Sequence, residues 1–175
     1  MESKKMNAIE ITDYGPEHQP YFERFNKNWI EEFYELEPDD RFVLTQPEEA
    51  IIKPGGAILM ALYEGDVAGT VALLKIDNET FEFTKLAVDP SFRRKGIAEA
   101  LSYASFEKGK ELGAATIILY SNTLQAAAIK LYEKLGFRHI PAEPGKYKRA
   151  NVKMILALNT VSKPATSYKY PATSK

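Results

Sequence analysis

The distribution of apolar residues near the start of the chain predicts a strand followed by a helix. Ile9 and Ile11 alternate with polar neighbours across residues 8–12, the period of a strand with one buried face. Residues 17–37 then repeat apolar side chains at helical spacing until Pro38 interrupts the pattern. The apolar stripe of this helix consists of Phe22, Phe25, Trp29 and Phe33. We expect these aromatic residues to belong to the core rather than to a substrate cage.

Three strand-like runs follow, and short turn signals separate them. Residues 57–63 and 67–76 flank a Glu-Gly-Asp turn, which is typical of a hairpin. Residues 80–88 follow after an Asp-Asn turn. Because strands joined by such short turns pair antiparallel, the sequence predicts a three-stranded meander.

In the second half of the chain, helical and strand patterns alternate. From about residue 94 the apolar period becomes helical, and Gly113 ends that helix. Its predicted stripe consists of Ala98, Leu101, Ser105, Gly109 and Leu112. A short β-rich run at 115–120 comes next. A strand that follows a helix in this way indicates a parallel neighbour reached by a right-handed crossover.

A second helix and two more strands complete the pattern. Residues 123–135 have helical spacing and end at Gly136. The side chains expected to face inward are Leu124, Ala128, Leu131 and Leu135. Strands at 137–140 and 151–158 follow. The fold class is therefore α/β with a mixed sheet.

The composition indicates one globular domain. Of the 175 residues, 45% are hydrophobic and 27% are charged, the balance of a soluble protein. A chain of this length buries a substantial core without cross-links, and we expect a single domain over 1–158. Residues 159–175 contain three lysines, two prolines and no acid. We expect them to form a C-terminal tail that is disordered or docked on the surface through Tyr168 and Tyr170.

Several kinds of chemistry and location are disfavoured. The formal net charge of −1 gives no field that would collect nucleic acid. The chain has no cysteine, which excludes disulfides, a thiolate nucleophile and cysteine-ligated metals. His18 and His139 are too few for most histidine-rich metal sites, so we expect no metal. With no apolar run long enough for a membrane span and no leader pattern, a cytoplasmic protein without membrane contact is expected.

A basic cluster before the predicted helix of residues 94–112 suggests an anion site. Arg93, Arg94 and Lys95 come directly before Gly96, where a strand and an Asp-Pro turn lead into the helix. Such an order sets free backbone N–H groups and the positive end of a helix dipole beside three cations. The sequence matches neither a P-loop nor a dinucleotide-binding glycine motif. The alternative is a plain turn glycine beside a solvated charge run.

Two motifs make the chain resemble the GNAT superfamily of acetyl-CoA-dependent N-acetyltransferases. Arg93-x-x-Gly96-x-Ala98 matches that family's Gln/Arg-x-x-Gly-x-Gly/Ala motif, and Leu-Ala-Val-Asp-Pro at 86–90 precedes it. Leu-Tyr-Glu-Lys-Leu-Gly-Phe at 131–137 looks like the family's closing helix and its Gly-Phe exit. The resemblance extends over about residues 9–158.

The resemblance implies a fold and a cosubstrate. The fold would be a mixed, mostly antiparallel sheet of six to seven strands, flanked by helices and splayed at the cofactor site. Acetyl-CoA would be the donor, with its diphosphate on backbone amides of about 94–99 and its pantetheine arm paired with strand backbone at 86–88. The implied cofactor contacts are Leu86, Ala87, Val88, Arg93, Arg94, Lys95, Gly96, Ile97, Ala98 and Glu99.

Acetyl transfer to an amine needs an uncharged nucleophile, a stabilised oxyanion and a proton for the departing thiolate. The resemblance favours Tyr132 as the proton donor, although position alone is also compatible with a structural aromatic residue. Glu82 is the candidate base, because some family members carry a catalytic glutamate there. The alternative for Glu82 is an ordinary solvent-facing strand residue. A backbone N–H near Val88 would hold the oxyanion.

Asn122 has two interpretations. Many relatives place an asparagine seven residues before the tyrosine to hold the cofactor arm, whereas Asn122 stands ten before Tyr132. The alternative is a helix N-cap, because Gln125 lies three residues later in capping-box register. We favour the cap and keep Asn122 as a candidate cofactor contact.

The expected function is acetyl transfer from acetyl-CoA to a primary amine by direct attack. Two alternatives stay open: a peptide or protein amine as acceptor, and an acyl-CoA-binding regulatory module without turnover. The acidic stretch from Glu31 to Glu49 either lines the mouth of an acceptor site or forms a solvated surface. The sequence leaves the oligomeric state open, with a homodimer as one option.

Overall fold

One seven-stranded sheet organises the part of the chain that the computed structural model describes, which is residues 8–143, 147–161 and 167–170. The strand order is β1-β2-β3-β4-β5-β7-β6. The strands are β1 (Ile9–Asp13), β2 (Ala57–Tyr63), β3 (Asp66–Lys75), β4 (Thr80–Val88), β5 (Thr116–Ser121), β6 (Arg138–Ile140) and β7 (Val152–Ala157). The helices are α2 (Gln19–Phe33), α3 (Pro38–Thr45), α4 (Ile97–Glu111) and α5 (Ala126–Leu135). Short helical turns are η1 (Pro16–His18), η2 (Glu48–Ile52), η3 (Pro90–Phe92) and η4 (Leu158–Thr160).

The pairing of the strands confirms the predicted mixed sheet. β1 to β4 are successive antiparallel neighbours, as the turn signals indicated. α4 then crosses over, and β5 pairs parallel with β4. β7 lies between β5 and β6 and is antiparallel to both. Among the seven strands of the described sheet, parallel pairing is therefore confined to β4 and β5.

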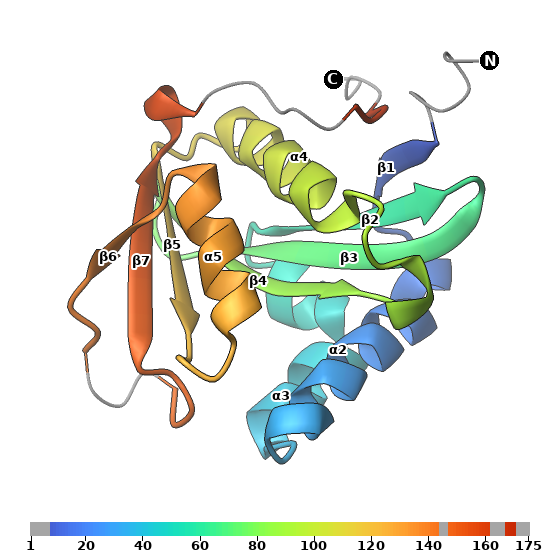
Figure 1. The fold of residues 1–175 in the computed structure, drawn as a ribbon, viewed down its shortest axis with the longest axis horizontal. Helices are drawn as coiled ribbons and strands as arrows, with labels where there is room; N and C mark the ends of the chain where they lie inside the picture. The colour runs from blue at the N-terminus through green and yellow to red at the C-terminus, as the bar shows by residue number, and fades with distance from the viewer. Residues whose placement is uncertain (1–7, 144–146, 162–166, 171–175) are drawn as a thin grey trace.

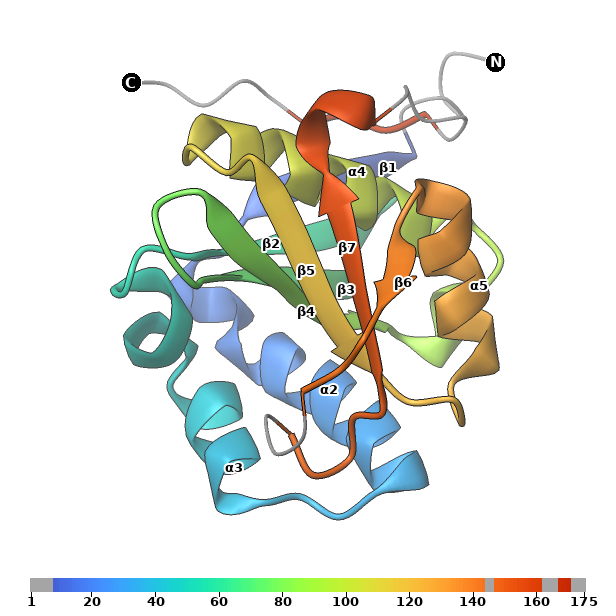
Figure 2. The same cartoon turned by 90° about the vertical axis from the view of Figure 1, so that its left-hand side faces the viewer.

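Helices cover both faces of this sheet (Figures 1 and 2). Residues of α4 and α5 join one apolar cluster with the sheet, in which the rings of Phe83, Phe106 and Phe137 are mutual neighbours. α2 and α3 cover the opposite face, where Phe22 and Ile30 are fully buried. The first apolar layer includes residues of β4 and β5, whereas the second packs on β2 and β3.

A bulge interrupts β4 where it pairs with β3. Thr70 pairs with Ala87 and Ala72 pairs with Thr84, so two residues, Lys85 and Leu86, lie opposite a single residue of β3. Lys85 has a φ of 59°, in the left-handed region that non-glycine residues rarely adopt. Such a bulge bends its strand and increases its twist.

β4 also separates from β5. Their parallel register begins at Thr80 with Thr116 and ends at Glu82 with Ile118. Beyond that point, the edge of β4 that faces β5 has no partner strand within the described residues. The predicted splay of the sheet is thus confirmed, and it exposes unpaired backbone donors and acceptors.

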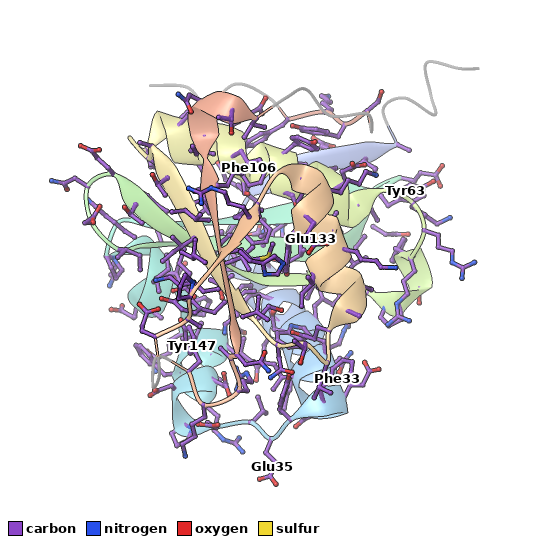
Figure 3. All side chains as sticks on the ribbon, turned by 60° about the vertical axis from the view of Figure 1, so that its left-hand side comes forward. Phe33, Glu35, Tyr63, Phe106, Glu133 and Tyr147 are labelled. Atoms are coloured by element: carbon purple, nitrogen blue, oxygen red, sulfur yellow. The ribbon has the colours of Figure 1, made fainter. Side chains whose placement is uncertain are left out.

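The first predicted helix is shorter than expected, and a second helix that the sequence analysis did not predict follows it. α2 ends at Phe33, and Pro38 is the first residue of α3, where proline is tolerated because it lacks only a donor that would be unused. Asp40 accepts a 2.9 Å hydrogen bond from the backbone N–H of Glu37 and so caps this second helix. Phe33 lies in the last turn of α2 and is 42% exposed, so its assignment to the core was wrong (Figure 3).

Two inward-facing assignments near helix ends were also wrong. Leu124 is 65% exposed, because α5 begins at Ala126 and Leu124 lies in the turn before it. Leu112 is exposed at the C-cap of α4. In both cases the helix is shorter than the run of residues with helical apolar spacing.

Residues 167–170 lie against the outer edge of β1. The backbone N–H of Ile11 donates to the carbonyl of Lys169 at 2.7 Å, and the N–H of Lys169 donates to the carbonyl of Ile9 at 2.9 Å. The Tyr170 hydroxyl donates a 2.9 Å hydrogen bond to Asp13. The remainder of the predicted tail, 162–166 and 171–175, lies outside the described residues.

Candidate active site

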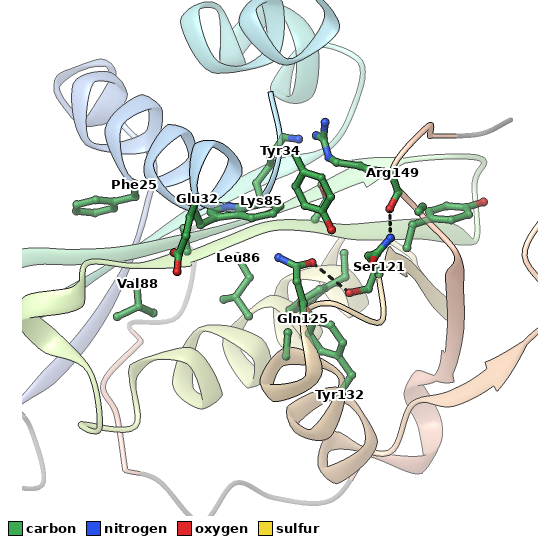
Figure 4. A pocket seen from close by; sticks show the side chains of 18 of the residues that line it. Phe25, Glu32, Tyr34, Lys85, Leu86, Val88, Ser121, Gln125, Tyr132 and Arg149 are labelled. Carbon is green, nitrogen blue, oxygen red and sulfur yellow. Dashed lines mark hydrogen bonds between the residues drawn. The ribbon is translucent and has the colours of Figure 1, made fainter. Parts of the chain in front are cut away.

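A cavity of about 280 Å³ opens where β4 and β5 separate (Figure 4). α2 and the residues after it form one wall, β4 and β5 the floor, and α5 the opposite wall. Of the candidate catalytic and cofactor residues, the cavity is lined by Glu82, Leu86, Ala87, Val88, Arg93, Asn122 and Tyr132. Phe25 and Trp29, which were expected to belong to the core only, line it as well. Segments from Phe25 to Ala150 thus meet at the gap in the sheet.

The remaining predicted cofactor residues lie at the start of α4. Gly96 is the N-cap with a φ of 83°, and no side chain caps the helix. The first helical hydrogen bond runs from Ala100 N–H to Gly96 carbonyl, so the amides of Ile97 and Ala98 point out of the helix end. These amides and the helix dipole are available to an anion at this place.

The basic side chains beside Gly96 point in different directions. Arg93, Arg94 and Lys95 are all exposed, and only Arg93 lines the cavity. The Lys95 ammonium lies 5.1 Å from the centre of the Tyr63 ring, on the side of β2. Arg93 is therefore the one cation of this cluster that lines the cavity, and Arg94 and Lys95 do not line it.

Glu99 in the first turn of α4 is oriented toward α5. Its carboxylate lies 3.3 Å from the Lys134 ammonium. This ion pair ties the two helices on either side of the gap together. Its backbone amide, rather than its carboxylate, is the group that suits an anion.

Tyr132 lies on α5 and faces the sheet. Its ring makes edge contacts with Phe83 on β4 and Phe137, at centroid distances of 5.8 and 6.1 Å. Burial raises the pKa of the Tyr132 hydroxyl to about 12. The phenol is therefore protonated at neutral pH, which is the state a proton donor needs.

Glu82 is the last residue of β4 that pairs with β5, and it is 1% exposed. Its Oε2 accepts a 2.8 Å hydrogen bond from the Tyr147 hydroxyl. The Tyr147 ring packs edge-on against Tyr120 of β5, at 5.3 Å between centroids. The solvent-facing alternative for Glu82 was wrong, because the loop before β7 covers this residue.

Asn122 closes the turn between β5 and α5. Its Oδ1 accepts from Leu124 N–H at 2.8 Å, and its Nδ2 donates to the Arg149 carbonyl at 2.6 Å. The N-cap assignment was wrong, because Gln125 occupies that position. Asn122 therefore fixes a wall of the cavity by joining two loops.

Several residues that line the cavity were not identified from the sequence. The Arg149 guanidinium makes two hydrogen bonds, of 2.6 and 3.1 Å, to the Asp40 carboxylate. The same guanidinium lies 5.6 Å from the centre of the Tyr34 ring. Lys85, at the bulge, also lines the cavity. Arg149 thus contacts both Tyr34 at the end of α2 and Asp40 in α3.

The acidic stretch contributes little to this cavity. Glu32 lines it, whereas Glu37, Asp39 and Asp40 line a second cavity of about 290 Å³ behind β4. Burial alone would raise the pKa of Asp40, but hydrogen bonds from Arg149 and the Glu37 amide lower it below the usual range. Most of the segment is exposed.

The bulged strand leaves unpaired backbone groups beside the open gap, and the uncapped helix after Gly96 presents free amides. A family model described as the acetyltransferase (GNAT) family matches residues 18–137, which is most of the chain. This protein belongs to the GNAT family of acetyltransferases, whose acyl donor is acetyl-CoA.

Individual relatives agree with that assignment. The chain is 38% identical over 90 residues to N-acetylaspartate synthetase of Rattus norvegicus, covering 51% of this chain and 30% of that protein. A GNAT acetyltransferase structure from Staphylococcus aureus Mu50 has a TM-score of 0.77 at 23% identity, covering 86% of this chain and 99% of that one. The PaiA N-acetyltransferase of Thermoplasma acidophilum, solved with coenzyme A, has a TM-score of 0.69 at 18% identity, covering 85% and 98%.

The chain spans only about three tenths of the rat relative. None of the helices in the described part of the chain is long and apolar enough to cross a membrane.

Proposed function

We propose that this acetyltransferase moves the acetyl group of acetyl-CoA to a primary amine by direct attack, with no covalent enzyme intermediate. The observation that carries the proposal is the position of Tyr132, across the β4–β5 gap from the unpaired backbone of β4. The pantetheine arm pairs with residues 86–88, and the amides after Gly96 hold the diphosphate. The thioester then ends between β4 and α5.

The proposed reaction forms one carbon–nitrogen bond and breaks one carbon–sulfur bond. The uncharged amine attacks the acetyl carbon, and a backbone N–H near Val88 stabilises the charge that develops on the carbonyl oxygen. Tyr132 gives its proton to the departing thiolate. The amine loses one proton as the amide forms.

Glu82 is the proposed acceptor of that proton. Its buried carboxylate lies at the closed end of the gap, four residues before Leu86. Four residues of strand span at most about 13 Å, so a bridging water carries the proton between the amine and the carboxylate. The hydrogen bond from Tyr147 keeps the carboxylate oriented.

The shape of the cavity supports a small acceptor over a peptide. Tyr34 and Trp29 line a cavity of about 280 Å³, slightly below the range of small-molecule sites, about 300–1,000 Å³. A peptide amine would need an extended groove. The name of the rat relative adds amino acids to the acceptors worth testing, although this chain spans a minor part of that protein.

Two measurements on the purified protein test the proposal: thiol release from acetyl-CoA with a panel of amines, and coenzyme A binding by calorimetry. We expect binding together with amine-dependent thiol release. Binding without turnover on any amine would instead indicate an acyl-CoA-binding regulatory module. If neither is observed, the assignment of the gap as a coenzyme A site is wrong.

A further inference from the structure

We infer that the acceptor carries a free carboxylate as well as its amine, and that Lys85, Tyr34 and Arg149 form the subsite for it. This inference rests on the proposed function and concerns the part of the cavity that the coenzyme does not use. In Figure 4 these three side chains lie on the α2 side of β4, and Tyr132 lies on the other side. The acceptor would therefore approach the thioester from the Lys85 side.

Lys85 has an unusual position. The bulge turns its backbone to a φ of 59° and places its side chain between the two cavities, where it lines both. No hydrogen bond or ion pair joins Lys85 to any residue of the described part of the chain. An ammonium group has three donors and no acceptor. Among the described residues no carboxylate forms an ion pair with this ammonium, although the charges of Asp40 and Glu82 influence it.

The hydroxyl of Tyr34 is a second donor without a partner. It is buried in the cavity wall and makes no hydrogen bond within the described structure. A buried polar group without a partner is unfavourable, and native structures usually explain it by a ligand or water. Tyr34 and Lys85 therefore provide two independent observations of unused donors in one cavity.

Arg149 completes a donor-rich wall. Two of its nitrogens bind Asp40, and its guanidinium lies over the Tyr34 ring. A guanidinium has five N–H donors, so the pair with Asp40 leaves further donors. Asp40 is engaged by Arg149 at two oxygens and does not line the first cavity.

The carboxylates that do line the cavity are in a different place from these donors. Glu82 lies at the floor of the gap and accepts from Tyr147, and Glu32 is exposed on α2. A molecule with both an amine and a carboxylate matches both regions: the acids attract its ammonium group, and the donors bind its carboxylate. A polyamine would place a second positive charge against Lys85 and Arg149.

Burial supports the same assignment. Burial lowers the pKa of Lys85, and the positive charge of Arg149 lowers it further. The negative charge of Asp40 acts in the opposite direction. A carboxylate bound beside Lys85 would favour its charged form. Binding of the acceptor would then place a counter-ion in direct contact with Lys85.

The first test compares each amino acid with its own amide on the wild-type enzyme. Pairs such as leucine and leucinamide, and β-alanine and β-alaninamide, keep the amine and neutralise the carboxylate. For at least one pair, we expect kcat/KM from thiol release to be about 10²-fold higher for the free acid, as for other buried charge pairs. The amide has the less basic amine, so intrinsic reactivity favours the opposite order.

The second test removes the charge of Lys85. Lys85→Met keeps the length of the side chain, and we expect it to raise KM for the preferred acid about tenfold or more while leaving KM for the amide unchanged. Tyr34→Phe should raise the same KM by about three- to tenfold. Lys130→Met, on the exposed side of α5, is the matched control and should change neither.

The outcomes separate this inference from the proposed function. Turnover of acids and amides with similar kcat/KM, or a Lys85→Met variant with an unchanged acid preference, would overturn the carboxylate subsite and leave acetyl transfer intact. Coenzyme A binding without turnover of any amine would overturn both.

Discussion

The Tyr147 hydroxyl donates a 2.8 Å hydrogen bond to Oε2 of Glu82, across 65 residues of sequence. This contact joins the loop before β7 to the point where β4 and β5 separate. It buries a carboxylate at the closed end of the active-site gap and supplies a neutral donor to it. The reactivity of the Glu82 carboxylate can therefore be tested by substituting either Glu82 or Tyr147.

Replacing the carboxylate tests whether Glu82 accepts the proton of the amine. We expect Glu82→Gln to lower kcat by about 10²-fold or more at every pH, because the amide is not a base. Affinity for coenzyme A, measured by calorimetry, should stay the same. A nearly normal pH–rate profile would remove Glu82 from the mechanism.

Replacing the phenol should have a smaller and different effect. In Tyr147→Phe, Glu82 loses a donor that favours its charged form, so the acidic limb of the profile of kcat/KM against pH should move to higher pH. The maximal rate should change less than in Glu82→Gln. An unchanged acidic limb would indicate that the contact only packs the loop.

Tyr132→Phe tests the proton donor on α5. The ring contacts with Phe83 and Phe137 need no hydroxyl, so the fold and coenzyme A affinity should be preserved. We expect kcat to fall by about 10²- to 10⁴-fold, the usual contribution of a positioned acid. Burial raises the pKa of Tyr132 to about 12, so the wild-type enzyme should show no loss of the phenol proton below about pH 11. Unchanged turnover in the variant would remove Tyr132 from the reaction.

Two glycines, one at each end of α4, provide a test of the proposed diphosphate site and a matched control. Gly96 and Gly113 have φ values of 83° and 98°, and an alanine at either place costs about 1–2 kcal/mol of stability. Gly96→Ala should in addition weaken coenzyme A binding about tenfold, because its Cβ lies at the helix end that holds the anion. Gly113→Ala should leave binding unchanged. Equal affinities in calorimetry would contradict the placement of the diphosphate.

Asp40 and Arg149 should contribute to stability in a pH-dependent way. Asp40 has a lowered pKa in the folded protein, so its contribution is present above the unfolded pKa, about 4, and is lost as pH falls through the lower, folded value. At neutral pH, Asp40→Asn should reduce the free energy of unfolding by about 1–3 kcal/mol. In chemical denaturation, the difference from wild type should shrink below about pH 4, whereas Asp39→Asn, at an exposed neighbour, should have little effect at any pH.

The sequence was sufficient for the elements that local patterns encode. Alternation and turn residues located the strands of the meander, and the basic cluster before Gly96 located the start of α4. Helix ends were less predictable, because apolar spacing continues through Phe33 and Leu124 although neither is buried by the fold. At those places tertiary packing, rather than periodicity, decides where burial ends.

The acceptor side of the cavity could not be predicted, because its residues meet only in the folded chain. Arg149 lies 109 residues from Asp40, in a loop with no periodic pattern. Lys85 occupies a left-handed position within a run that resembles a regular strand, and no turn residue marks the bulge. Tyr34 is the C-cap residue of α2 and lies outside the predicted apolar stripe, so no spacing identified it.

The segment 167–170 has a consequence for how two copies of this chain could associate. It occupies backbone groups of β1 that would otherwise serve as a template for a strand from another molecule. At the opposite border of the described sheet, β6 is only three residues long. A dimer made by continuing one sheet into another would have to form through that short border, so helix surfaces are the better place to look for a self-association interface.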